Sequence, residues 1–580
     1  MRIAVLDSGI ERDALERYNV VDSYLLVGNG IQWEIHKDFA DDDLGHGTAI
    51  AHIIHETNKD AEIINVKICN NNVGVDEYGL ICALRFLQNI DVDVINISAG
   101  INYLDDYPLL NEICNQLVRQ RKVIVSAYDN DGAISFPAAL DSVIGVDVNK
   151  TYENKNEIVR IKDSIVDIVV PEKYYRTIWK DTKTIVNGTS FACAYVSGRL
   201  SLFDVREHNK DILLEMLATK VVDKTESFEL PRLPFDIKSA VIFPLNKESE
   251  VLLRFQDSLS FSISAVFDDK MVGRVGSNVF GFEVRSIDTL DWDSDFDTII
   301  ISCTSELMRL TGKNYVTVLL EKAKKHQKNV YSFENLETIY ERVFYPGLSD
   351  VMVPHKNRCK LYKTSIPVVG VFGTSSKQGK YTIQRQIIKL LSEWGYSVGS
   401  IATEPSGYLF DADYVFHFGY NAELPLAPWQ CVAVLNEMLW NIQLSGKDVV
   451  ITGCQSNTIH YNSSRVEDFA IYQYGYLLGV MPDFYVLCVN PHDEFEYIQR
   501  SIDFLNSVDV GKVGALVLFP MLAYETLSGI GYKTRKMTEE ELYYSKEALF
   551  QKFNIPVFLL GDQGDLAELC KKIINELSQD

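Results

Sequence analysis

Three short segments, each placing one polar side chain beside glycine, constrain this chain more than any other feature of its sequence. They are Asp7-Ser8-Gly9, Gly45-His46-Gly47 and Gly188-Thr189-Ser190. A serine hydroxyl is a weak nucleophile unless a base lies within hydrogen-bond reach, and that base needs an acid to hold its tautomer. Ser190, His46 and Asp7 can supply these three roles. The sequence therefore predicts a nucleophilic hydrolase in the N-terminal part of the chain.

Local patterns predict the elements that hold these side chains. An apolar strand ends at Asp7, a helical run over 49–54 follows His46, and a helix over 191–200 begins beside Ser190. A helix N-terminus favours developing negative charge, which suits the position of a nucleophile. The chain order Asp, His, Ser resembles that of the subtilisin-like serine proteases. The resemblance implies an α/β fold with a doubly wound parallel sheet, and a serine endopeptidase that acts on a peptide substrate.

Two further segments resemble the same family. Residues 123–132 resemble the strand and turn that carry the oxyanion-hole asparagine, and Asn130 falls on the matching position. The resemblance implies that Asn130 and the Ser190 N–H bind the oxyanion, and losing such a donor raises the barrier by about 3–4 kcal/mol. Residues 94–100 resemble the strand that pairs with an extended peptide. The resemblance implies these substrate-binding residues: Ser98, Ala99, Gly100, Tyr128 and Asp129.

The sequence departs from the family pattern near the nucleophile and the pocket. Ala194 stands where a proline usually follows, and Tyr128 and Asp129 replace small residues just before Asn130. In this family that strand lines the pocket for the residue before the cut, so we expect a restricted pocket that accepts a small or a basic side chain. A degenerate, inactive protease is the alternative. All four predicted catalytic positions are intact, which favours the active enzyme.

Composition excludes several classes of protein. The net charge is −24 with no basic tract, so we expect no nucleic-acid partner, because phosphate binding depends on Lys and Arg. No apolar run approaches the roughly 20 residues of a membrane span. The ten cysteines are scattered, and the chain starts with a strand-like segment, so we expect reduced thiols in a cytoplasmic protein. His52, His55 and Glu56 are predicted as a helix face rather than a metal site, and a homo-oligomer is left open.

The length predicts more than one domain. At 580 residues the chain exceeds a single core, and two to four domains are expected. We expect boundaries at 1–228, 236–362 and 363–580, with a proline-containing linker over 229–235. In the second domain, short apolar strands and one helical segment predict a small Rossmann-like fold. It lacks the glycine spacing of a dinucleotide fingerprint, so a structural or docking role is expected.

The third domain opens with a strand, a glycine-containing loop, a lysine and a helix, which is the context of a phosphate-binding loop. We expect Lys380 to reach the terminal phosphates of ATP or GTP and Thr382 to bind magnesium; proteolysis itself needs no cofactor. The predicted nucleotide-binding residues are Gly373, Thr374, Ser375, Gly379, Lys380, Tyr381 and Thr382. The loop carries one extra residue, as in dethiobiotin synthetase-like enzymes. Thr452 stands where similar sequences carry an acid, which weakens the case for hydrolysis more than for binding.

The layout of residues 240–580 resembles proteins of bacterial systems that mature ribosomally made peptides. We therefore expect an endopeptidase that cuts a precursor or leader peptide and carries a nucleotide-binding C-terminal region. One alternative is a nucleotide-dependent scaffold or kinase-like protein that uses the protease fold to bind peptides. Another is an ATP-regulated protease in stress or defence.

Overall fold

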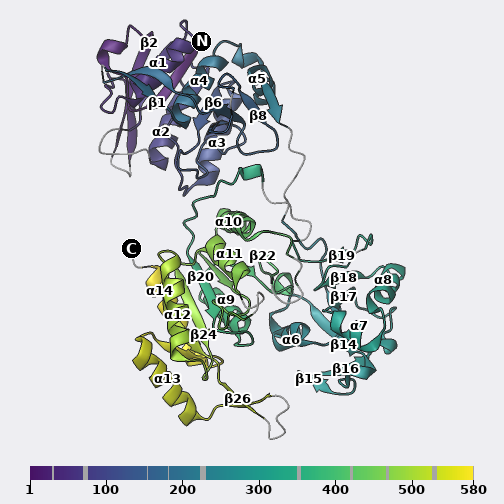
Figure 1. Cartoon of the computed structure of the whole chain (residues 1–580). Helices are drawn as coiled ribbons and strands as arrows, with labels where there is room; N and C mark the ends of the chain where they lie inside the picture. Colours follow the sequence, from purple (N-terminus) through teal and green to yellow (C-terminus); the bar gives the residue numbers. More distant parts are fainter. Residues whose placement is uncertain are drawn as a thin grey trace. The chain divides into compact units, whose positions relative to one another are not determined.

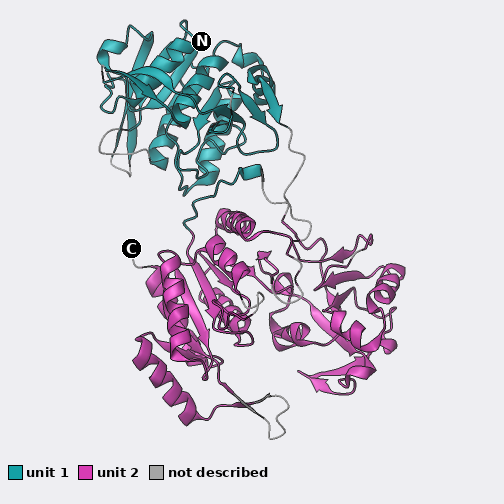
Figure 2. Ribbon diagram, in the orientation of Figure 1, with its two compact units in different colours: residues 1–228, 354–365 teal, residues 229–353, 366–580 magenta. Residues whose placement is uncertain are grey.

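The computed structural model divides the chain into two compact units (Figure 2). Unit 1 comprises residues 1–228 and 354–365, and unit 2 comprises 229–353 and 366–580. The described residues are 1–28, 32–69, 76–152, 154–180, 182–222, 230–336, 338–348, 355–418, 422, 424–464, 469–525 and 532–578. A short segment that follows the Rossmann-like region in sequence thus belongs to the N-terminal unit.

Unit 1 is built on one large sheet with the strand order β12-β8-β9-β7-β6-β5-β1-β4-β2-β3 (Figure 1). Its central strands pair in parallel and are buried on both faces, which explains their nearly continuous apolar sequences. The strands are β1 (Arg2–Asp7), β2 (Val20–Gly28), β3 (Trp33–His36), β4 (Glu62–Lys67), β5 (Val94–Ile97), β6 (Val123–Ala127), β7 (Ile144–Asn149), β8 (Val159–Ile161), β9 (Ile168–Pro171) and β12 (Lys220–Val222).

Helices cover this sheet, and two of them carry predicted catalytic residues at their starts. The helices are α1 (His46–Thr57), α2 (Glu77–Leu87), α3 (Tyr107–Arg119), α4 (Thr189–Leu200) and α5 (Lys210–Leu217). The apolar sides of α1 and α4 share one core cluster with strands β1 and β6. An antiparallel hairpin, β10 (Tyr175–Trp179) and β11 (Thr182–Val186), immediately precedes α4. This packing sets the starts of α1 and α4 near the end of β1.

The first part of unit 2 is a sheet with the order β15-β16-β14-β13-β17-β18-β19. From β16 to β19 all neighbours are parallel, and their sequence order is the 3-2-1-4-5-6 arrangement of the Rossmann fold. The strands are β13 (Ser239–Phe243), β14 (Ser262–Asp268), β15 (Asn278–Val279), β16 (Phe282–Ser286), β17 (Thr298–Ile301), β18 (Asn329–Ser332) and β19 (Val343–Phe344). The helices are α6 (Lys247–Arg254), α7 (Ser305–Thr311) and α8 (Tyr315–Lys325).

The second part of unit 2 is a parallel sheet with the order β22-β21-β23-β20-β24-β25-β28. Its strands are β20 (Val368–Gly373), β21 (Val398–Ala402), β22 (Tyr414–Val415), β23 (Val449–Gly453), β24 (Phe484–Val489), β25 (Lys512–Leu518) and β28 (Val557–Leu559), with a separate hairpin of β26 (Met521–Glu525) and β27 (Tyr532–Lys536). The helices are α9 (Lys380–Glu393), α10 (Pro428–Leu444), α11 (Ile471–Val480), α12 (Phe495–Val508), α13 (Glu539–Phe553) and α14 (Gln563–Leu577). The predicted α/β class is confirmed. Among the described helices, none is long and apolar enough to cross a membrane.

Candidate active site

The end of β1 and the start of α1 bring Asp7 and His46 together. His46 Nδ1 donates to Asp7 Oδ1 at 2.8 Å, and the Ser8 N–H donates to the same oxygen at 2.8 Å. The start of α1 lies directly against the turn after β1, because a Cβ on Gly47 would sit 2.2 Å from the Gly9 carbonyl oxygen. Glycine at position 47 therefore allows the approach that puts the imidazole on the carboxylate.

The electrostatics of Asp7 and His46 favour a charged carboxylate and a protonated imidazole. Burial disfavours the charge on Asp7, but His46 and the Ser8 N–H outweigh it, so the pKa of Asp7 lies below its usual range. Burial also disfavours the His46 cation. The charge and hydrogen bond of Asp7, with a smaller contribution from Asp42, outweigh that burial and raise the pKa of His46. A carboxylate with a depressed pKa beside an imidazole with a raised one suits a base that is held in one tautomer.

Asp42 organises this corner, although the sequence alone did not single it out. Its Oδ1 accepts from Ser8 Oγ at 2.7 Å and from the Gly45 N–H at 2.7 Å. Its Oδ2 accepts from the Thr48 N–H at 2.8 Å and from Thr48 Oγ1 at 2.7 Å. Three consecutive aspartates, 41–43, precede the helix, and no local signal distinguishes the one that faces inward.

Ser190 is the second residue of α4, in its first turn. Its hydroxyl donates to the Ser98 carbonyl oxygen at 2.9 Å. The ring of the next residue, Phe191, lies 5.2 Å from the His46 ring between centroids. Trp179, at the end of β10, meets the His46 ring edge-on at 5.8 Å. Sequence reasoning missed Trp179, because only the hairpin brings it to the imidazole.

Asn130 is anchored to the start of the same helix. Its Oδ1 accepts from the Thr189 N–H at 3.0 Å and from Thr189 Oγ1 at 3.1 Å. The residue is exposed, and no described residue accepts a hydrogen bond from its amide NH₂ group. With its oxygen fixed by Thr189, the NH₂ group is left to donate to a ligand beside Ser190.

The predicted substrate residues Ser98, Ala99 and Gly100 follow β5, and the space beside Gly100 is occupied. A Cβ on Gly100 would lie 3.1 Å from Ser135 Cβ, and Ser135 is fully buried. Ser135 Oγ accepts from the Asp129 N–H at 3.0 Å, and Asn102 Nδ2 donates to Asp129 Oδ2 at 2.5 Å. Ser135 and Asn102 thus narrow the region between Gly100 and Asp129.

The side chain of Tyr128 does not reach this region. It is buried in the interior, where its hydroxyl donates to the Ile165 carbonyl oxygen, and burial raises the pKa of Tyr128 well above its usual value. The expectation that this side chain contacts substrate therefore does not match its position. His52, one of the residues weighed as a metal ligand, pairs through Nδ1 with the Tyr18 hydroxyl at 3.1 Å. Among the described residues no cluster of three metal-ligating side chains is found.

A strap from later in the chain, residues 355–361, packs on unit 1 behind the Asn130 segment. The Ile134 N–H donates to the Leu361 carbonyl oxygen at 3.0 Å, and the Ile165 N–H donates to the Lys356 carbonyl oxygen at 3.1 Å. The Lys360 ammonium lies 3.3 Å from Asp147 and 5.3 Å from the centre of the Tyr128 ring. The strap is thus hydrogen-bonded to Ile134 and Ile165.

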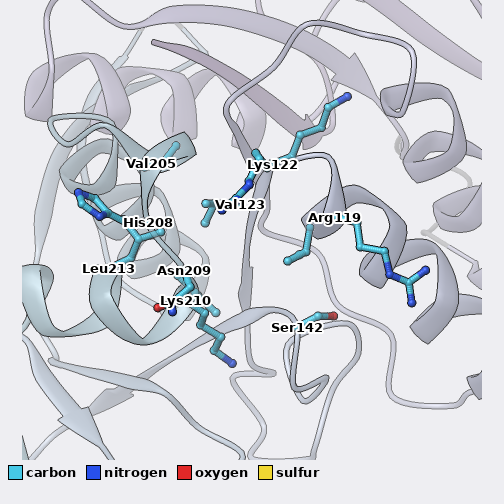
Figure 3. Close-up of a pocket in the computed structure, with 12 residues that line it drawn as sticks. Arg119, Lys122, Val123, Ser142, Val205, His208, Asn209, Lys210 and Leu213 are labelled. Carbon is cyan, nitrogen blue, oxygen red and sulfur yellow. The ribbon is translucent and has the colours of Figure 1, made fainter.

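A separate pocket of about 330 Å³ lies between α3 and α5 (Figure 3). Three of its four Lys and Arg side chains are engaged with the protein. Lys122 binds the carbonyl oxygens of Leu87, Gln88 and Ile90, and Lys210 binds those of Asp141 and Val143. Arg119 pairs with Glu112 at 3.2 Å. None of the predicted catalytic residues lines this pocket.

In unit 2, the predicted phosphate loop joins β20 to α9. Lys380 is buried as the first residue of α9, and its ammonium donates to the Ser375 carbonyl oxygen at 2.6 Å; burial lowers the pKa of Lys380. The side chain of Gln378 folds into the loop. Its Oε1 accepts from the Ser375 N–H at 2.9 Å, the kind of contact a phosphate oxygen makes. The loop thus has a buried cation and a backbone donor directed inward.

The remaining predicted loop residues are tied to neighbouring strands. Thr374 Oγ1 donates to Asp493, and Asn490 Nδ2 donates to Ser375 Oγ at 2.9 Å. Tyr381 packs with its ring 6.2 Å from that of Phe410. Gly373 ends β20, and Gly379 and Thr382 flank the start of α9. The structure therefore places all seven predicted residues around one loop.

The two parts of the chain that hold these sites match known protein families. Residues 1–221 match the model of the Subtilase family. The N-terminal part of the chain is a subtilase domain. Residues 355–569 match the P-loop domain described as a domain of unknown function, DUF1611_C, so the chain joins a subtilase domain to a DUF1611 P-loop domain. The match to the second family begins within the strap that packs on unit 1.

Parts of the chain are similar to individual known proteins. Subtilisin DY of Bacillus licheniformis is 22% identical over 217 residues, which is 35% of this chain and 76% of that protein. A solved lanthipeptide protease is 20% identical, with a TM-score of 0.31 and coverage of 37% of this chain and 78% of that one. A DUF1611 family protein from Anabaena variabilis is 12% identical, with a TM-score of 0.43 and coverage of 59% and 100%.

Proposed function

We propose that the subtilase domain is a serine endopeptidase in which Ser190 is the nucleophile. His46 takes the Ser190 proton and returns it to the leaving amine, while Asp7 orients the imidazole and stabilises the imidazolium. The Asn130 amide and the Ser190 N–H bind the oxyanion. The observation that carries this proposal is the 2.8 Å hydrogen bond between His46 and Asp7, with Ser190 and Asn130 both at the start of α4.

Substrate binding would prepare the nucleophile. The Ser190 hydroxyl rests on the Ser98 carbonyl oxygen. An extended peptide that adds to the strand at 98–100 would offer a backbone N–H to the same carbonyl oxygen. Competition for that acceptor would free the Ser190 hydroxyl to turn toward His46.

The proposed substrate is an extended peptide with a small side chain before the cut bond. Ser135 fills the space beside Gly100, and both Asp129 oxygens accept hydrogen bonds, one from Asn102 and one from the Asp131 N–H. A carboxylate with both oxygens occupied is a poor partner for a basic side chain, so of the two predicted preferences the small one is favoured. We propose a precursor or leader peptide as the natural substrate, cut in the cytoplasm.

A fluorophosphonate probe, which labels activated serines, tests the proposal on the full chain. Wild-type protein should be labelled, and Ser190→Ala should abolish labelling. Ser126→Ala is the matched control, because its buried hydroxyl has no partner among the described residues, and this variant should be labelled normally. Unlabelled, folded wild-type protein would contradict the proposal and favour a peptide-binding scaffold.

We further propose that the P-loop domain binds ATP or GTP. The buried ammonium of Lys380 and the inward Ser375 N–H support this, because both suit phosphate oxygens. Magnesium suits the same place, where the Thr382 hydroxyl lies two residues after Lys380 in the first turn of α9 and would be its ligand. A fluorescent nucleotide should bind wild type and not Lys380→Ala. A peptidase rate that changes with nucleotide would favour a nucleotide-regulated protease.

A further inference from the structure

We propose that the Rossmann-like part of unit 2 completes this nucleotide site. Lys247 supplies a second cation for the terminal phosphates, and Glu404 supplies the acidic group that Thr452 does not. The inference rests on the proposed nucleotide binding at Lys380, and it assigns a ligand-binding role to a sheet that has no phosphate fingerprint of its own.

The loop that follows β21 lies between the two parts of unit 2. On one side, Arg385 of α9 donates to the Phe410 carbonyl oxygen at 3.0 Å. On the other, the Tyr331 hydroxyl of β18 donates to the Pro405 carbonyl oxygen at 2.6 Å, and Phe255 meets the Phe410 ring edge-on at 6.3 Å. The segment 404–410 is therefore held by both α9 and the Rossmann-like part.

The same packing brings the start of α6 toward the phosphate loop. Val251 of α6 joins the apolar cluster that includes Phe410 and Tyr381, and Tyr381 directly follows Lys380. Lys247 is the first residue of α6 and lies four positions before Val251, so both occupy one face of the helix. Lys247 therefore lies at the edge of the apolar cluster to which Tyr381, the neighbour of Lys380, also belongs.

The charged groups of Lys247, Lys380 and Glu404 influence one another electrostatically. The charge of Lys247 acts on both Lys380 and Glu404, and Lys380 and Glu404 act on each other. Burial raises the pKa of Glu404 and lowers that of Lys380, so both charges lack water and gain from a ligand of the right sign. Lys247 is exposed, and no described residue lies within ion-pair distance of its ammonium. A phosphate group bound at Lys380 would give it a partner.

Glu404 stands in for an acid that the neighbouring strand lacks. The hydroxyl of Thr452 donates to the Ile401 carbonyl oxygen at 3.2 Å and bonds the Tyr476 hydroxyl, so it is committed to the core. Ile401 and Thr452 are paired across β21 and β23, and Glu404 follows three residues later at the same carboxyl edge. Carboxylate oxygen is a preferred magnesium ligand. Glu404 therefore has the position and chemistry to hold the metal that accompanies a nucleoside triphosphate.

In the Rossmann-like part, the N-terminus of α6 is closed by a capping box. Asn246 caps α6 by accepting from the Ser249 N–H at 3.1 Å, and Ser249 Oγ accepts from the Asn246 N–H at 2.9 Å. These contacts occupy donors that bind pyrophosphate in dinucleotide-binding folds. Lys247 is the first residue after the cap. In the proposed site it is the residue at the start of α6 that binds phosphate.

Fluorescent ATP and ADP analogues, titrated onto the full chain with and without magnesium, test this site. Lys247→Met should weaken ATP binding about tenfold and ADP binding less, because one charge-assisted contact to the terminal phosphate is lost. Glu404→Gln should remove most of the gain in ATP affinity that magnesium produces. Lys322→Met on α8 and Glu306→Gln on α7, both exposed, are the matched controls and should bind as wild type.

The outcomes separate the two proposals. If wild type binds neither nucleotide, the proposed nucleotide function fails. If wild type binds and Lys380→Ala does not, yet Lys247→Met and Glu404→Gln match wild type, the composite site is overturned. Equal weakening of ATP and ADP by Lys247→Met would also overturn its assignment. If Lys247→Met fails to fold in a thermal melt, Lys247→Arg keeps the charge and should retain ATP binding.

Discussion

At the scale of single residues, Asp42 shows how a side chain outside the proposed catalytic set prepares it. Its two oxygens accept five hydrogen bonds, from Ser8, Leu44, Gly45 and Thr48, which fixes the turn that leads into His46. It also adds negative potential at the imidazole, which favours the cation. The Asp42 carboxylate thus orders the turn before His46 and also helps to raise the pKa of His46.

The pH dependence of labelling should report this potential. A general base must be neutral, so the rate of fluorophosphonate labelling should rise with pH through the pKa of His46, above the ordinary value of 6.5. Asp42→Asn removes a charge that stabilises the imidazolium, so the pKa falls and the acid limb should move to lower pH. Asp43→Asn is the control and should leave the limb in place. A limb that moves to higher pH in Asp42→Asn would contradict this account.

At the scale of elements, two segments close the pocket together. The chain after β5 bridges the 134–136 segment through reciprocal hydrogen bonds between Ile101 and Phe136, at 2.9 and 2.8 Å. This bridge fixes Ser135 against Gly100. A wall tied at the backbone cannot move by rotating one side chain, so we expect the residue at position 135 to set the size of the proposed substrate pocket.

Replacing Ser135 should therefore change which peptides are cut. Ser135→Gly removes the group beside Gly100, and the ratio of kcat/KM for a leucine over an alanine before the cut bond should rise about tenfold or more. Ser135→Ala keeps the Cβ and should leave the ratio close to that of wild type. This control distinguishes the effect of side-chain volume at position 135 from the effect of the lost hydroxyl hydrogen bond. Matched peptide pairs measure the ratio. An unchanged ratio in Ser135→Gly would show that the pocket lies elsewhere.

At the scale of the whole molecule, the strap makes the subtilase domain depend on a later part of the chain. Residues 355–361 are bonded to Ile134 and Ile165, and Lys360 brings its charge to Asp147 in a largely buried setting. Only a few residues separate the strap from β20, which runs directly into the phosphate loop. The covalent path from the predicted phosphate loop to the strap bonded to Ile134 is therefore short.

Breaking the buried pair should destabilise unit 1. Lys360→Met leaves Asp147 without its cation, and the free energy of unfolding should fall by about 3 kcal/mol. The urea concentration at which probe labelling is lost reports unit 1 alone. Adding Asp147→Asn to Lys360→Met should recover much of the loss, because the uncompensated charge is gone. A double variant as unstable as the sum of its parts would show that the two groups do not interact.

Much of the fold and of the candidate site could be predicted from sequence because the deciding signals are local. The apolar segment before Asp7 and the glycines around His46 predict a buried strand and a helix start, and the structure has β1 and α1 there. The loop before Lys380 likewise predicted the start of α9. The side chain of Tyr128 was wrongly expected to contact substrate, because the sequence does not indicate that the residue directly after β6 turns into the core.

Local spacing and residue chemistry by themselves thus determined the α/β class, the Asp, His and Ser segments, and the phosphate loop. The tertiary structure alone decided that Asp42 bonds Ser8 and Thr48, that Ser135 lies against Gly100 and that α6 shares an apolar cluster with Tyr381. It also placed the Ser164 hydroxyl within hydrogen-bond distance of the Lys356 carbonyl oxygen, 192 residues away in sequence. These contacts depend on how distant segments pack, and packing is set by the whole core rather than by any short run of residues.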